Sequence, residues 1–257
     1  MLRRSSLLKN VLPVAAIAAT MAWAGTANAS LIVDGDGNAI LGIQKKLAIN
    51  NDQSPNPLLF VTNIYVRFSE ANDSLLNIGF STMNSKRGDF FRHPLGLAFD
   101  GPPSEDLIVN GIPALGIPPQ KNLAFTTFVT IGLKNSNSEG GEPNFGDDTT
   151  GFDFDFDFGA NRIVGGWFAS PDSGQGDAGL WGVNPVDGAY WILVAQLTVA
   201  NDPNGGVVGD FRVFWKEDPD AGEQSNLAFF DNPVPSPGAL ALLGLAGLVG
   251  AHRRRRR

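Results

Sequence analysis

The sequence predicts an all-β protein, a single β-sandwich of jelly-roll type, on the basis of three observations. Apolar and polar residues alternate in many segments, with the period of two that puts alternate side chains on one face of a strand. The connections between these segments are rich in Gly, Pro, Asn and Asp, the residues that turns require. No stretch of the predicted body has the apolar spacing of an amphipathic helix of ordinary length.

Five segments show the alternation most clearly, and we expect them to be the principal strands: 58–69, 75–82, 125–133, 189–200 and 211–215. The segment 189–200 is apolar on both faces, which predicts a central strand. The alternate apolar side chains of these strands are expected to face the core: Phe60, Ile64, Val66, Phe68, Leu76, Ile78, Phe80, Phe125, Val129, Ile131, Leu133, Trp191, Leu193, Leu197, Val199, Phe211, Val213 and Trp215. Shorter candidate strands are 31–33, 40–43, 46–49, 107–109, 163–168 and 227–229.

The predicted body is one domain, residues 30–233, because no linker divides it. Residues 1–29 before it have the organisation of a secretory signal peptide, with basic residues near the start and an apolar run over residues 11–25. Ala27 and Ala29 supply the small side chains of a cleavage site. We therefore expect export through the general secretory translocon.

The C-terminal segment, residues 234–257, has three parts. A motif with two prolines comes first: Val234, Pro235, Ser236 and Pro237. An uncharged apolar run follows over residues 238–251, and as a helix it would span about 21 Å. The chain ends in a block of arginines: Arg253, Arg254, Arg255, Arg256 and Arg257.

These lengths predict a transient transmembrane helix, because the apolar run is shorter than the roughly 30 Å of hydrocarbon in a bilayer. The arginine block is expected to stay on the cytoplasmic side of the inner membrane, with the body on the other side. An ordinary tail anchor and a nucleic-acid-binding arginine block are the alternatives.

The order of motif, short apolar helix and terminal arginines resembles the PEP-CTERM sorting domain of exported bacterial proteins. The usual motif of that family is Val-Pro-Glu-Pro, and Ser236 stands here in place of Glu. The resemblance covers only residues 234–257. It implies recognition by an exosortase, a membrane-embedded transpeptidase-like enzyme that cleaves near the motif and releases the body or transfers it to the cell surface.

The charge of the body is strongly negative. Eight of the 19 basic residues, but none of the 26 acidic ones, lie in the two end segments, which leaves the body with a net charge of −15. Such a charge repels nucleic acid and attracts divalent cations. Cysteine is absent, which excludes disulfides, Cys-based metal sites and thiol catalysis.

Residues 152–158 alternate Phe and Asp. On a strand, Asp153, Asp155 and Asp157 would share one face, with neighbouring carboxylates roughly 7 Å apart. Such carboxylates repel one another unless they are solvated, paired or bridged by a cation. A Ca²⁺ site is therefore one prediction, because Ca²⁺ prefers several oxygen ligands. A solvent-facing acidic stripe over an aromatic core face is the alternative.

Trp181, in a Gly-rich stretch, is the aromatic residue that we most expect to be exposed, and it is a candidate for stacking on a sugar ring. Packing in the core or in a loop is the alternative for Trp181. Trp191 and Trp215 lie on apolar strand faces and are expected in the core.

The sequence contains no catalytic motif that we can identify. The predicted body has a single histidine, His93, and lacks a nucleophile elbow, a zinc-protease helix, a phosphate loop and a dinucleotide fingerprint. We therefore expect a non-enzymatic structural or adhesive protein at the cell surface or in the extracellular matrix, with exopolysaccharide as a candidate partner. One alternative is a carbohydrate-binding module. Another is a polysaccharide-active enzyme, which would need two carboxyl groups roughly 5–10 Å apart in a cleft.

Overall fold

A computed structural model describes residues 28–33, 39–49, 58–93, 123–133, 150–169, 174–185, 187–217 and 220–234. The predicted signal segment up to Ala27, the tail from Pro235 to Arg257 and the candidate strand 107–109 lie outside the described residues. Within the described residues, no helix is both long and apolar enough to cross a membrane.

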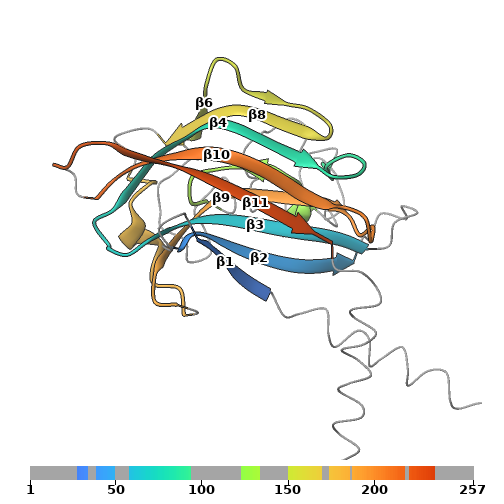
Figure 1. The fold of residues 1–257 in the computed structure, drawn as a ribbon, viewed down its shortest axis with the longest axis horizontal. Helices are drawn as coiled ribbons and strands as arrows, with labels where there is room; N and C mark the ends of the chain where they lie inside the picture. The colour runs from blue at the N-terminus through green and yellow to red at the C-terminus, as the bar shows by residue number, and fades with distance from the viewer. Residues whose placement is uncertain are drawn as a thin grey trace, which may run out of the picture.

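The described chain is built almost entirely from strands, and every strand pairing is antiparallel (Figure 1). The strands are β1 (Asn28–Val33), β2 (Ala39–Ile49), β3 (Leu58–Phe68), β4 (Ser74–Ser85), β5 (Phe128–Val129), β6 (Thr150–Phe152), β7 (Asp157–Phe158), β8 (Arg162–Ala169), β9 (Tyr190–Ala200), β10 (Gly206–Lys216) and β11 (Gln224–Pro233). Two short 3₁₀ turns, η3 (Leu123–Phe125) and η4 (Ala178–Trp181), are the helical elements of the described part. The predicted all-β class is confirmed.

The strands form two sheets. The first sheet has the order β1-β2-β3-β9-β5, and the second has the order β11-β10-β4-β8-β6, with β7 also paired to β8. The chain passes from the first sheet to the second three times, between β3 and β4, between β5 and β6, and between β9 and β10. Because β3 neighbours β9 in the first sheet and β4 neighbours β10 in the second, the first and the last of these crossings lie next to each other.

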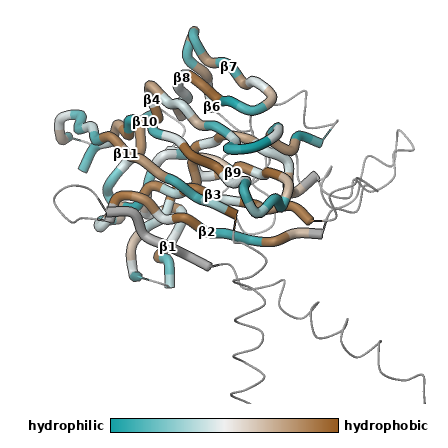
Figure 2. The backbone as a smooth tube through the Cα atoms, turned by 45° about the vertical axis from the view of Figure 1, so that its right-hand side comes forward, coloured by the Kyte–Doolittle hydropathy of each residue, from teal (hydrophilic) through white to brown (hydrophobic). Residues whose placement is uncertain are grey.

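One hydrophobic core joins the two sheets. Its members include Phe60 of β3 and Leu197 of β9 from the first sheet, and Phe211 of β10 and Trp167 of β8 from the second. Trp167 is fully buried, and its indole Nε1 donates a hydrogen bond of 2.9 Å to the carbonyl of Thr130. Along the tube in Figure 2, hydrophobic residues recur within the strands, as expected for strands that bury at least one face.

The alternation in β3 predicts its inner face correctly, since Phe60, Ile64, Val66 and Phe68 all belong to the shared core. The predictions for β10 are also confirmed: Phe211 and Val213 are buried and Trp215 packs against the core. The candidate strands 40–43 and 46–49 are parts of one strand, β2.

The prediction of one inner face along β9 is wrong, although its central position is confirmed. The pairing with β3 shifts between Ile64 and Tyr65, where β9 contains one extra residue, Val194. Such a bulge changes the face on which the following side chains lie. Leu197 therefore lies in the shared core, whereas Trp191 packs with Tyr65 in a second cluster.

The prediction that Phe80 points inward is also wrong. The pairing of β4 with β8 is irregular between Ile78 and Ser81, and Phe80 has a φ of 51° and is 77% exposed. The left-handed backbone conformation costs a non-Gly residue on the order of 1–3 kcal/mol in folding free energy. Leu75 is buried whereas Leu76 is only half-buried, because a second irregularity lies between Phe214 and Trp215 of the partner strand β10.

Segment 125–133 contains only the two-residue strand β5. Its inward prediction holds for Val129 and Ile131, which lie in the shared core, and Leu133 is fully buried. Phe125 instead ends the 3₁₀ turn η3 and packs on a third cluster on the other side of the first sheet.

Candidate functional site

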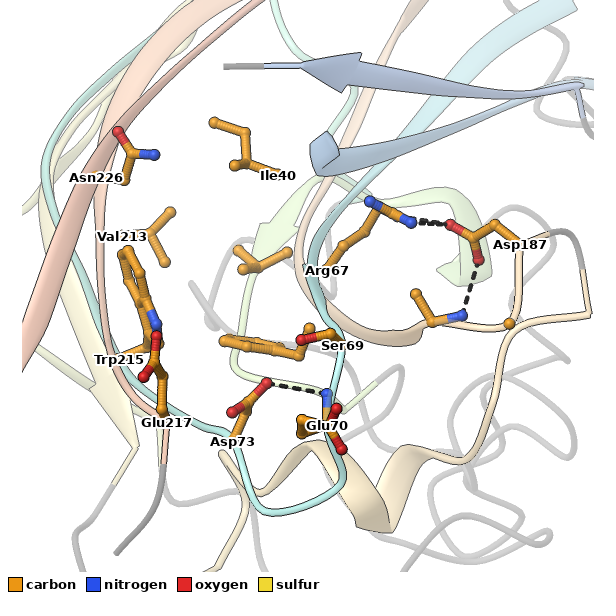
Figure 3. Close-up of a pocket in the computed structure, with 14 residues that line it drawn as sticks. Ile40, Arg67, Ser69, Glu70, Asp73, Asp187, Val213, Trp215, Glu217 and Asn226 are labelled. Atoms are coloured by element: carbon orange, nitrogen blue, oxygen red, sulfur yellow. Dashed lines mark hydrogen bonds and ion pairs between the residues drawn. The ribbon is translucent and has the colours of Figure 1, made fainter. Parts of the chain in front are cut away.

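A cavity with a volume of about 680 Å³ lies at one end of the two sheets (Figure 3). We call it the cleft. It is lined from the first sheet by the ends of β2 and β3, and from the second sheet by the ends of β10 and β11. The turn between β3 and β4 and the segment that precedes β9 complete its wall.

The lining of the cleft combines aromatic and acidic side chains. Phe68 of β3 and Trp215 of β10 are the aromatic residues, and Trp215 is only half-buried. Four carboxyl groups line the same space: Glu70, Asp73, Asp187 and Glu217. Figure 3 shows Trp215 and Glu217 on the opposite side of the cleft from Arg67 and Ser69. An apolar ring facing polar groups across a cleft is the usual composition of a small-molecule site.

The surroundings of Asp73 shift the pKa of its carboxyl group. It is 5% exposed, and its Oδ2 accepts a hydrogen bond of 3.1 Å from the backbone N–H of Glu70. Burial raises the pKa of Asp73, and the negative charges of Glu217 and Glu70 raise it further, against the lowering effect of the backbone hydrogen bond. A carboxyl group that is protonated more readily can donate a hydrogen bond as well as accept one.

Asp187 is held in place by several partners. It forms an ion pair with Arg67, whose Nε donates to Oδ2 over 2.6 Å. Its Oδ1 also accepts hydrogen bonds from the backbone N–H of Ala189 (3.2 Å) and from the indole N–H of Trp191 (3.1 Å). This carboxylate therefore holds the wall of the cleft in place. The other acidic residues that line the cleft are Glu70, Asp73 and Glu217.

Trp181 lies at the end of η4, away from the residues that line the cleft. It is half-buried and packs against the shared core, and its indole Nε1 donates a hydrogen bond of 3.0 Å to the carbonyl of Gln175. Its ring lies directly over Gly132, where a Cβ would collide with it. Stacking of a sugar on Trp181 stays a prediction.

The Phe-Asp stretch is not one continuous strand. β6 ends at Phe152, a turn follows, and β7 begins at Asp157, because the chain bends within this stretch and pairs twice with β8. Phe154 lies in the turn and is fully exposed, so the four phenylalanines do not share a buried face. Asp153, Asp155 and Asp157 are all exposed.

In the part of the chain that the structure describes, no group of three or more Asp, Glu, His or Cys side chains could hold a metal ion. The Ca²⁺ site at Asp153, Asp155 and Asp157 therefore stays a prediction. His93 is buried, and its backbone N–H donates a hydrogen bond of 3.1 Å to Thr126 Oγ1.

The described residues reach the edges of both targeting segments. Asn28 and Ala29 belong to β1 and pair with Lys45 and Gln44 of β2, so cleavage after Ala29 would leave β1 to begin at Ser30. At the other end, the first motif residue, Val234, is buried in the shared core, and its N–H donates a hydrogen bond of 3.1 Å to the carbonyl of Gly205.

Sequence reasoning missed the acidic residues of the cleft and assigned Trp215 only to the core. A signal was present at two strand ends: β3 ends at Phe68, two positions before Glu70, and Trp215 near the end of β10 lies two positions before Glu217. The arrangement of the two sheets that brings these two ends together could not be seen without the topology. No family model matches this chain, and no curated protein matches it.

Proposed function

We propose that this chain is an exported, non-enzymatic adhesive protein of the cell surface or extracellular matrix, and that it holds exopolysaccharide in the cleft. The observation that carries this proposal is the cleft itself, which has a volume of about 680 Å³ and in which the half-buried Trp215 faces hydrogen-bonding groups. Sugars present apolar C–H faces together with hydroxyl groups, and such a lining offers a partner for each.

The finer fold that we propose is a β-sandwich of jelly-roll type. Its support is the pair of adjacent crossings, β3 to β4 and β9 to β10, together with a core that draws side chains from both sheets. In this arrangement the cleft opens where the two layers separate at one end.

The delivery route that we propose is the general secretory translocon, transient anchoring in the inner membrane and cleavage near the motif by an exosortase-type enzyme. It rests on the two end segments of the sequence. The burial of Val234 adds a constraint, because a cut after Val234 keeps every strand of the described body, whereas a cut before it removes a core residue.

The binding proposal is tested with the mature protein recovered from cells that express the full chain, by affinity electrophoresis against a panel of soluble glycans. We expect Trp215→Ala to weaken retention by at least about tenfold, as the loss of an aromatic anchor does. Trp215→Phe should keep most of the retention. Phe229→Ala is the matched control, because Phe229 is exposed on β11 outside the cleft. Failure of the wild-type protein to bind any glycan would overturn the proposal.

The sorting proposal has a separate test. Replacement of Arg253 to Arg257 by Gln removes the charge that orients the tail, and we expect unprocessed chain to accumulate. Intact-mass measurement of the protein from its native cells reports both cleavage sites. An unchanged mature mass and unchanged surface delivery would show that the tail is not a sorting signal.

A polysaccharide-active enzyme is the second candidate, and the raised pKa of Asp73 beside Glu217 favours it. Glycoside hydrolysis uses two carboxyl groups in one cleft, and a raised pKa suits one of them to act as the acid. Release of reducing ends from the same glycan panel, abolished by Asp73→Asn, would support this candidate. Binding without release supports the adhesive protein.

A further inference from the structure

A second, smaller cavity of about 200 Å³ lies in the second sheet and shares no residue with the cleft. We call it the aromatic pocket. Three phenylalanines line it, Phe80 of β4, Phe168 of β8 and Phe214 of β10, together with Asn77 and the carboxyl groups of Asp153 and Asp155. Phe80 and Phe168 are exposed and Phe214 is half-buried, so large apolar surfaces face solvent here.

Irregular backbone and glycines build this pocket. The left-handed conformation of Phe80, at the irregular pairing of β4 with β8, turns a ring outward that regular alternation would have buried. The ring of Phe214 lies over Gly79, where a Cβ would come within 2.9 Å of it. The ring of Phe168 lies over Gly151, where a Cβ would come within 2.5 Å. The absence of these Cβ atoms lets both rings lie close to the sheet.

The described lining of the pocket carries negative charge and no positive charge. None of the residues that line it is basic. Among the ion pairs of the described residues, which join Arg67 to Asp187, Lys86 to Asp231 and Arg87 to Asp202, none involves Asp153 or Asp155. A cationic ligand would relieve the repulsion between these two carboxylates.

We infer that the aromatic pocket binds the ammonium group of an amino sugar, a hexosamine unit whose nitrogen is not acetylated. Aromatic faces attract an organic cation through their π-electrons, and carboxylates pair with it. The pyranose ring offers C–H groups to the phenylalanine rings, and the Asn77 amide is placed to bond a hydroxyl group. A neutral sugar would leave the two carboxylates without a counter-charge. A bare metal ion would leave the rings without a partner.

The inference deepens the proposed function, because it rests on exopolysaccharide as the source of the amino sugar. It nevertheless concerns a different site. The double variant Asp153→Asn/Asp155→Asn should therefore affect amino-sugar binding alone, and Trp215→Ala should affect cleft binding alone. The two proposals can fail separately.

The test is isothermal titration of the mature protein with an oligomer of glucosamine, at mildly acidic pH where its amino groups are protonated. The matched ligand is the fully N-acetylated oligomer of the same length. We expect binding of the glucosamine oligomer at least about tenfold tighter than of the acetylated one, and a steep fall in affinity with added salt. Equal binding of the two oligomers, or no binding of either, would overturn the inference.

Variants locate the binding site. We expect at least about tenfold weaker binding for Asp153→Asn/Asp155→Asn and for Phe80→Ala, since each removes one of the two partners of the cation. Asp157→Asn is the matched control, because Asp157 is a neighbouring exposed carboxylate that does not line the pocket. Unfolding curves establish whether each variant is folded. If the double variant Asp153→Asn/Asp155→Asn does not fold, the binding measured for Phe80→Ala decides whether the ligand occupies the aromatic pocket. Equal loss with Asp157→Asn would show that only the general negative charge attracts the ligand.

Two further ligands test the chemistry. Ca²⁺ alone should give no heat that depends on Phe80, and Ca²⁺ binding abolished by the double variant but unchanged in Phe80→Ala would identify a metal site instead. A lysine tetrapeptide carries similar charge without pyranose rings. If it binds as tightly as the glucosamine oligomer, the pocket recognises a basic peptide and the amino-sugar assignment is wrong.

Discussion

The first sheet covers its outer face with the protein's own side chains, whereas the second sheet exposes aromatic residues to solvent. On the outer side of the first sheet, Tyr65, Trp191 and Leu193 form a buried cluster, and Phe91 and Phe125 pack on a further cluster. On the second sheet, the exposed large apolar side chains of the described strands are Phe80, Phe152, Phe168, Leu227 and Phe229.

This difference separates structural aromatics from aromatics that are free to bind. Trp191 lies on the outer face of the first sheet, which we call the covered face. Its ring contacts that of Tyr65 at 5.4 Å between ring centroids, and its indole N–H donates a hydrogen bond to Asp187. Its role is therefore to hold the sheet and the wall of the cleft together. The exposed face of the second sheet, which we call the open face, carries aromatic side chains without such cover. Exposed apolar patches of this kind mark interaction sites.

The largest expected effect is on the covered face. Trp191→Ala should lower the free energy of unfolding by about 3–5 kcal/mol, because it leaves a cavity and removes a hydrogen bond to Asp187. Phe229→Ala on the open face should change it by no more than about 0.5 kcal/mol. Chemical denaturation of both variants measures the difference. Similar losses of unfolding free energy in Trp191→Ala and Phe229→Ala would show that aromatic side chains on the two faces contribute equally to stability.

Two glycines offer a matched pair of intermediate size. A Cβ at Gly42 would lie 2.5 Å from the ring of Trp191, which is buried and cannot move aside, so Gly42→Ala should cost about 1–3 kcal/mol. A Cβ at Gly79 would lie 2.9 Å from the ring of Phe214, which lies at the open face and can rotate away. Gly79→Ala should therefore cost less than about 1 kcal/mol. A larger loss for Gly79→Ala than for Gly42→Ala, by the same denaturation measurement, would contradict this account.

The sequence predicted the strands well because alternation reports burial directly. β3 and β10 follow a regular period of two, so Phe60, Ile64, Phe211 and Val213 lie where the pattern puts them. The period fails at Val194 and at Phe80, where one strand gains a residue relative to its partner. An irregularity of pairing depends on both strands, and a pattern within one segment does not contain that information.

The two cavities were harder to predict than the strands. The cleft depends on the ends of β3 and β10 meeting, which follows from strand order rather than from any local motif. The aromatic pocket depends on the conformation of Phe80 and on a turn within the Phe-Asp stretch, where the alternation of Phe and Asp predicts extended backbone. The spacing of Asp153, Asp155 and Asp157 predicts a Ca²⁺ site, whereas the neighbours of Asp153 and Asp155 from β4, β8 and β10 are the reason that we propose a different ligand.

A smaller effect is expected from relief of strain on the open face. Phe80→Gly should leave stability unchanged or raise it by up to about 1 kcal/mol, because Gly adopts positive φ without strain but loses more entropy on folding. The matched change Phe229→Gly, in regular strand backbone, should cost about 1 kcal/mol. Denaturation midpoints compare the two. A clear loss of stability in Phe80→Gly would show that the ring is structural, as on the covered face.

The smallest effect concerns the turn between β3 and β4, where the chain leaves the covered sheet for the open one. Burial raises the pKa of Asp73 above its ordinary value of 3.8, with Glu217 and Glu70 adding to the shift, so the folded protein keeps a proton that the unfolded chain has released. The stability that the neutral carboxyl contributes is therefore present below the unfolded pKa and is lost as pH rises through the folded pKa.

Asp73→Asn, which keeps an oxygen acceptor for the N–H of Glu70, should be more stable than the wild type at neutral pH by less than about 1 kcal/mol. The difference should disappear in acid. A stability difference for Asp73→Asn that stayed constant between acidic and neutral pH, in denaturant titrations, would show that the carboxyl has the same pKa in the folded and the unfolded chain and that burial does not raise it.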